Sequence, residues 1–145
     1  MKIPEYVSKT EVKRVCKEIG LRDWSIFKEV AVAKKEAETI LQIVNVEKMA
    51  IPVEEFRQGL EVELEHGTRF EDANVTNNHP LLTGKIVLAH LKETMDYYER
   101  LEVAETEGDL LKAVRAKNLK KVEEKYKKLI KAENILNKAV AAQIK

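Results

Sequence analysis

Apolar side chains recur every three or four residues through most of the chain, and this spacing constrains the fold more than any other feature. Val53, Phe56, Leu60 and Leu64 form one such series. Apolar residues at this spacing share one face of an α-helix, whereas a half-buried strand needs alternation with a period of two. No alternating run of useful length occurs in the 145 residues. The sequence therefore predicts an all-α fold.

Capping and helix-stopping residues divide the apolar series into segments. Ser8, with Glu11 three residues later, is typical of a helix N-terminus, and Gly20 is typical of a helix end. Pro52 favours the first turn of a longer helix that ends at Gly67. We expect helices over residues 9–19, around 23–27, 34–44, 52–67, 83–106 and from about 109 to near the C-terminus, with an irregular loop over 67–83.

The predicted helices form two parts of unequal length. Residues 1–48 are predicted to form a short N-terminal helical subdomain, packed on a bundle of three longer antiparallel helices in residues 49–145. Residues 48–109 contain fourteen acids and six bases, and residues 110–145 contain eleven bases and three acids. Opposite charges of this kind can neutralise each other within a fold or across a dimer. Because three long helices leave apolar surface to cover, we expect one compact unit that forms a homodimer.

Composition excludes several classes of protein. No stretch approaches the roughly 18 consecutive apolar residues of a membrane span, so no membrane partner is expected. The first residues, MKIPEYVSKTEVKR, lack the apolar segment of a secretory signal. The single cysteine, Cys16, excludes an internal disulfide and a cysteine cluster for zinc or iron–sulfur. These features favour a cytoplasmic protein.

Two of the three histidines each have a glutamate one helical turn away. Glu63 and His66 are three residues apart on one predicted helix, and His90 and Glu93 are three apart on the next. Carboxylate and imidazole at this spacing hold metal ions in helical bundles. We therefore predict a divalent metal site for iron, manganese or zinc, with Glu63, His66, His90 and Glu93 as ligands.

The same region also fits a polar cluster that holds no metal. His90, Glu93, Tyr97 and Arg100 share one side of the predicted helix over residues 83–106. That helix is apolar on other sides as well, which is typical of a helix at the centre of a fold. Buried ionisable groups need hydrogen-bonding partners, so Asp96, Tyr97 and Arg100 are candidates for a structural cluster that sets helix register. In that case the protein is a non-catalytic interaction or assembly protein.

Other motifs carry less weight. The small residue, turn glycine and apolar residue at positions 16, 20 and 26 match a helix-turn-helix. The segment that would read DNA, WSIFKEVAV, offers few polar side chains for base edges, so nucleic acid is the least favoured partner. His79, before Pro80 in the long loop, is expected to be a surface residue in a turn. The sequence contains no phosphate-binding loop, dinucleotide fingerprint or nucleophile elbow, so it assigns neither a reaction nor a small-molecule substrate.

Several short motifs follow one another over residues 54–102: VELEHG, Asn-Val-Thr, TGKIVLAHL and DYY. In this order they resemble the motifs of an uncharacterised family of small proteins from microbes and their viruses. That family is a domain of unknown function, so the resemblance implies no activity. It implies a specific role for the paired helices, with Glu63, Glu65, His66, His90 and Asp96-Tyr97-Tyr98 as motif positions.

Overall fold

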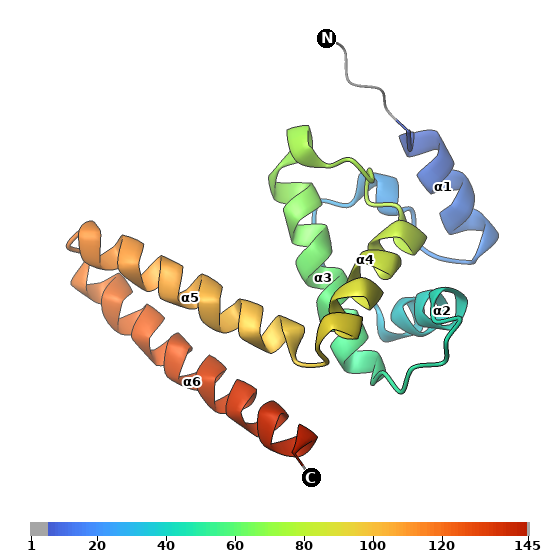
Figure 1. The fold of residues 1–145 in the computed structure, drawn as a ribbon. Helices are drawn as coiled ribbons and strands as arrows, with labels where there is room; N and C mark the ends of the chain where they lie inside the picture. The colour runs from blue at the N-terminus through green and yellow to red at the C-terminus, as the bar shows by residue number, and fades with distance from the viewer. Residues whose placement is uncertain (1–5, 145) are drawn as a thin grey trace. The chain divides into compact units, whose positions relative to one another are not determined.

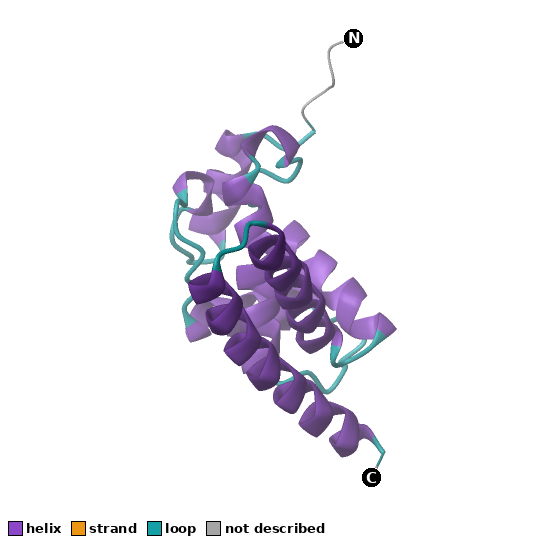
Figure 2. Cartoon of the chain, turned by 90° about the vertical axis from the view of Figure 1, so that its left-hand side faces the viewer, coloured by secondary structure: helices purple, strands orange, loops and turns teal. Residues whose placement is uncertain are grey.

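The computed structural model describes residues 6–144 as helices joined by short loops (Figures 1 and 2). No strand occurs in that range, which confirms the all-α prediction. The elements are α1 (Lys9–Glu18), the 3-10 turn η1 (Trp24–Ile26), α2 (Lys34–Val44), α3 (Val53–Arg69), the 3-10 turn η2 (Glu71–Ala73), α4 (Pro80–Glu93), α5 (Tyr97–Arg115) and α6 (Leu119–Gln143). None of these helices is long and apolar enough to cross a membrane.

Contacts within the chain group it into two compact units, Met1–Lys92 and Glu93–Lys145. The first unit contains α1 to α3 and α4 up to Lys92, and the second contains Glu93, α5 and α6. The domain boundary that the sequence suggests between residues 48 and 49 stays a prediction.

The first unit buries the apolar faces of α2, α3 and α4 against one another. Ile40 of α2, Phe56 and Leu60 of α3 and Val87 of α4 have no exposed surface. At Gly84 of α4 the helices approach closely, because a Cβ there would lie 2.6 Å from Ile40 Cγ2 and 3.4 Å from Phe56 Cζ. Gly84, in the Thr-Gly-Lys sequence, therefore lies where α4 closely approaches α2 and α3.

The N-terminal segment begins as the sequence predicts and then departs from the prediction. Ser8 caps α1 by accepting a hydrogen bond from the Glu11 N–H, and Gly20 turns the chain with a φ of 72°. The short helix expected around residues 23–27 is only the three-residue turn η1, capped by Asp23, with Trp24 fully buried. The second helix of a helix-turn-helix motif is therefore absent from this described segment.

Helix boundaries in the second half of the chain also differ from the prediction. The helix expected over 83–106 begins at Pro80 and ends at Glu93, and α5 begins at Tyr97 after a break. Asp96, the residue before α5, lies in that break and accepts side-chain hydrogen bonds from Thr94 and Arg100. At Gly108 the sequence predicts a break, yet α5 continues, because glycine costs a helix only about 1 kcal/mol relative to alanine.

In the second unit α5 and α6 form an antiparallel hairpin with a tight turn between them (Figure 1). Lys117, in the turn, has a positive φ of 53°, and the Asn118 side chain caps α6. Lys125 of α6 pairs with Asp109 of α5 at 2.9 Å. The residues buried in the two helices are mostly small: Tyr98, Thr106, Ala113, Leu129 and Ala132.

Candidate functional sites

The carboxylate of Glu63 lies between two imidazoles in the first unit. Its Oε1 is 3.5 Å from His90 Nε2 of α4, and its Oε2 is 4.0 Å from His66 Nδ1, one turn further along α3. The exposed fractions of the side chains are 15% for Glu63, 28% for His90 and 52% for His66. The packing of α3 and α4 thus brings three of the four predicted metal ligands together at the surface.

The fourth predicted ligand is placed differently. Glu93 is the last residue of α4, and its side chain is exposed. Because the helix ends there, His90, Glu93 and Tyr97 do not form the continuous buried row that the sequence suggests. Within residues 6–144, no group of three or more His, Cys, Asp or Glu side chains is arranged to hold a metal ion.

Asp96 and Arg100 form a compact ion pair at the start of α5. Asp96 is only 1% exposed and accepts hydrogen bonds from Arg100 Nε at 2.9 Å and Nη2 at 2.8 Å, and one from the Thr94 hydroxyl. The Arg100 hydrogen bonds lower the pKa of Asp96 to about 2. Tyr97, the third member of the predicted cluster, packs edge-on against Tyr98 with ring centroids 5.2 Å apart. This geometry favours a structural role at the break between α4 and α5.

His79 is buried, so the expectation of a surface histidine is wrong. Only 8% of it is exposed, and its Nδ1 accepts hydrogen bonds from the N–H groups of Leu81 and Leu82 at 3.2 and 3.4 Å. The imidazole therefore satisfies orphan N–H groups in the first turn of α4. Burial lowers the pKa of His79, because desolvation disfavours the charged ring.

Asparagine side chains join the loop after α3 to that helix by hydrogen bonds. Asn74 Nδ2 donates to the carbonyl oxygen of Gly67 at 3.0 Å and to Asn78 Oδ1 at 2.8 Å. A Cβ on Gly67 would collide with both asparagine side chains, coming within 2.8 Å of Asn74 Nδ2. The glycine of VELEHG and the asparagine of Asn-Val-Thr therefore act together to close the loop.

Glu36 is a buried polar residue that the sequence reading missed. Its carboxylate accepts two hydrogen bonds from the Arg22 guanidinium, at 2.6 and 3.0 Å, and others from the N–H groups of Arg22 and Ala33. Burial raises the pKa of Glu36, but these hydrogen bonds outweigh burial and leave the pKa below its ordinary value. The available signal was a glutamate in the first turn of the predicted helix over residues 34–44.

An apolar stripe follows one side of the α5–α6 hairpin. On each helix three apolar residues are spaced by seven and then four positions. Both series lie about 100° from the buried seam, and in an antiparallel pair this places them on the same side of the hairpin. We call this stripe the apolar face: Val103, Leu110 and Val114 of α5, with Leu119, Tyr126 and Ile130 of α6.

Four of the six residues of the apolar face are exposed to solvent, and Val103 and Leu110 are half-buried. Leu119 is 82% exposed, Tyr126 is 57%, Val114 is 52% and Ile130 is 44%. Single exposed apolar residues are ordinary on protein surfaces, whereas these residues share one side of the hairpin.

A family model described as "Protein of unknown function (DUF5661)" matches residues 12–107, from α1 into the middle of α5. The match confirms the resemblance to an uncharacterised family and extends it on both sides of the motifs. No curated protein and no solved structure matches the chain.

Proposed function

Because the chain belongs to the DUF5661 family of proteins of unknown function, we propose a role from geometry: it is a non-catalytic helical assembly protein. It associates with a second copy of itself through the apolar face. The exposure of that face is the observation that carries the proposal.

The core that α5 and α6 bury between them is small for two helices that pack only against each other. Thr106, Ala113 and Ala132 are three of the five buried residues of α5 and α6. Each buried CH₂ group contributes about 0.8 kcal/mol, so such short side chains contribute little. Covering the apolar face with another helical hairpin would give the larger core of a four-helix bundle.

Charge favours a second copy as the occupant. Helix α5 carries five acids and three bases, whereas α6 carries seven bases and three acids. If the two-fold axis runs along the bundle, α5 of each copy lies beside α6 of the other, so the acidic helix meets the basic one. A two-fold axis across the bundle would instead place helices of like charge side by side.

The mass in solution tests this proposal. We expect light scattering to give twice the chain mass of 16.6 kDa for the wild type. Tyr126→Lys should give the monomer mass, because a buried lysine without a partner opposes association. Ile135→Lys is the matched control: Ile135 is also 57% exposed, but it lies on the opposite side of α6 from the apolar face.

Circular dichroism should show the same helix content for the three proteins. A monomeric wild type at high protein concentration would overturn the proposal, as would a Tyr126→Lys variant that still forms the dimer.

The position of Glu63 between two imidazoles favours a second candidate function, the binding of a divalent metal. Two histidines and a carboxylate are a ligand set of catalytic zinc sites that leave a fourth position open. Ligand atoms about 2.1 Å from one tetrahedral ion are roughly 3.4 Å apart, close to the distance between Glu63 and His90. His66, whose Nδ1 lies 4.0 Å from Glu63 Oε2, is the third member of this set, and Glu93 stays a ligand predicted from the sequence alone.

Metal retention tests the second candidate. We expect protein incubated with Zn²⁺ and then desalted to keep one ion per chain, measured by elemental mass spectrometry. Glu63→Gln and His90→Ala should lose the ion, whereas Glu65→Gln, on the same helix but paired with Arg69, should keep it. An unloaded wild type would refute this candidate and leave the assembly proposal untouched.

A further inference from the structure

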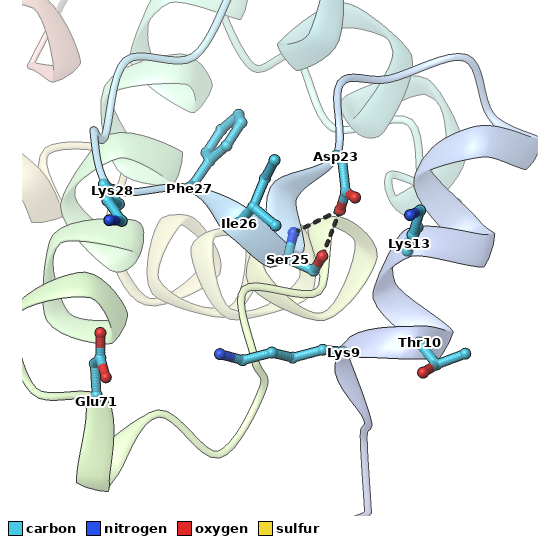
Figure 3. Close-up of a pocket in the computed structure, with 9 residues that line it drawn as sticks. All are labelled: Lys9, Thr10, Lys13, Asp23, Ser25, Ile26, Phe27, Lys28 and Glu71. Atoms are coloured by element: carbon cyan, nitrogen blue, oxygen red, sulfur yellow. Dashed lines mark hydrogen bonds between the residues drawn. The ribbon is translucent and has the colours of Figure 1, made fainter.

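A basic pocket opens between the first turns of α1 and the turn η1 (Figure 3). Its volume is about 450 Å³, which lies in the range of small-ligand sites. We call it the basic pocket, and its lining is Lys9, Thr10, Lys13, Asp23, Ser25, Ile26, Phe27, Lys28 and Glu71.

Three lysines surround the basic pocket. Lys9 and Lys13 come from α1, Lys28 follows η1, and the Lys9 side chain extends across the opening (Figure 3). None of the three makes a hydrogen bond or ion pair with residues 6–144. The nearby arginines differ, because Arg14 is paired with Glu11 and Glu18, and Arg22 with Glu36. The lysines are therefore the cations left available for a ligand.

The two acids of the basic pocket do not cancel these charges. Asp23 Oδ1 accepts hydrogen bonds from the N–H of Ser25 at 3.0 Å and from its hydroxyl at 2.5 Å. Glu71 stands at the opposite edge, on η2 (Figure 3). Three ammonium groups against two carboxylates leave a net positive site.

One wall of the basic pocket is apolar. Ile26 is 72% exposed, and Phe27 stacks on Trp24 with ring centroids 5.5 Å apart. The Arg22 guanidinium lies 4.8 Å from the Phe27 ring centroid and holds this ring in place. The wall thus offers a fixed apolar surface beside the lysines.

A smaller polar cavity of about 100 Å³ shares Lys9, Ser25, Phe27 and Glu71 with the basic pocket. Asn74 and Asn78 line it, at the place where the loop closes on Gly67. The combined lining offers cations, hydrogen-bonding side chains and an apolar wall.

We propose that the basic pocket binds a small phosphorylated molecule that carries an apolar or aromatic group. The phosphate binds to lysine ammonium groups of the lining through charge-assisted hydrogen bonds, with Lys9 and Lys13, one turn apart on α1, as the expected contacts. The apolar group lies on the wall formed by Ile26 and Phe27. This proposal is independent of self-association and of the metal candidate.

Adenosine 5′-monophosphate is the probe, because it combines a phosphate with a flat aromatic ring. In amide NMR spectra we expect saturable shifts confined to residues 9–13 and 23–28. A Lys9→Ala/Lys13→Ala double variant should weaken binding by about tenfold or more, since two charge-assisted contacts are lost. Lys17→Ala, which removes one positive charge from α1 outside the pocket, should leave affinity within about twofold.

Two further probes separate the contributions of the phosphate and the ring. Adenosine and inorganic phosphate should each bind at least about tenfold more weakly than the combined molecule. The absence of saturable shifts at millimolar adenosine monophosphate would overturn the proposal. It would also be overturned if the double variant bound as the wild type does, or if inorganic phosphate alone bound equally well.

Discussion

Individual polar residues fasten the short elements of the first unit to its helices. Glu36 joins the segment around Arg22 to the start of α2, and His79 satisfies the first turn of α4. The cap at Ser8 could be predicted, because its partner is three residues away. The burial of Glu36 and His79 could not, because segments distant in the sequence cover them.

Replacing Glu36 tests how much one buried polar residue contributes to stability. Glu36→Gln should lower the free energy of unfolding by about 2 kcal/mol, because it removes the charge that pairs with Arg22 and leaves a buried amide. Urea denaturation at neutral pH measures the change. The exposed neighbour Glu38 is the control, and Glu38→Gln should change stability by less than about 0.5 kcal/mol. Equal effects of the two substitutions would contradict the assigned role of Glu36.

At the scale of elements, helices with clear caps and apolar spacing could be predicted closely. The helix expected over residues 34–44 is observed as Lys34–Val44, and Pro52 immediately precedes α3. The break between α4 and α5 was missed because no glycine or proline marks it. It coincides with the Asp96–Arg100 pair, whose spacing also occurs inside ordinary helices.

Replacing two helical glycines with alanine should change the free energy of unfolding in opposite directions. Gly84→Ala should lower the free energy of unfolding by about 1–3 kcal/mol, because its Cβ meets the buried Ile40 and Phe56. Gly108→Ala should raise it by about 0.5–1 kcal/mol, since no atom lies within 4 Å and alanine favours the helix. Thermal unfolding of both variants checks the pair. A stabilising Gly84→Ala would contradict the close crossing of α4.

At the scale of the whole molecule, the sequence predicted the all-α class and a grouping of Glu63, His66 and His90. Spacing alone could not show that His66 is half exposed or that Glu93 lies at a helix end. These depend on how α3 and α4 pack and on where α4 stops. The contrast in charge between the middle and the end of the chain could be read directly, and α5, with two more acids than bases, and α6, with four more bases than acids, retain part of it. The homodimer stays a prediction.

Disulfide trapping tests the central claim most directly, namely that α5 of one copy packs beside α6 of another. Val103 and Ile130 lie at similar positions along the axis of the hairpin, on the apolar face. Cys16 is only 1% exposed, so it should not compete with the introduced cysteines for disulfide formation. Val103→Cys and Ile130→Cys chains are refolded together and mildly oxidised, and mass spectrometry identifies the linked peptides. We predict a disulfide between position 103 of one copy and position 130 of the other, because neighbouring helices bring such residues within bonding range. Links between two copies of position 103 only, or the absence of any link, would contradict the account.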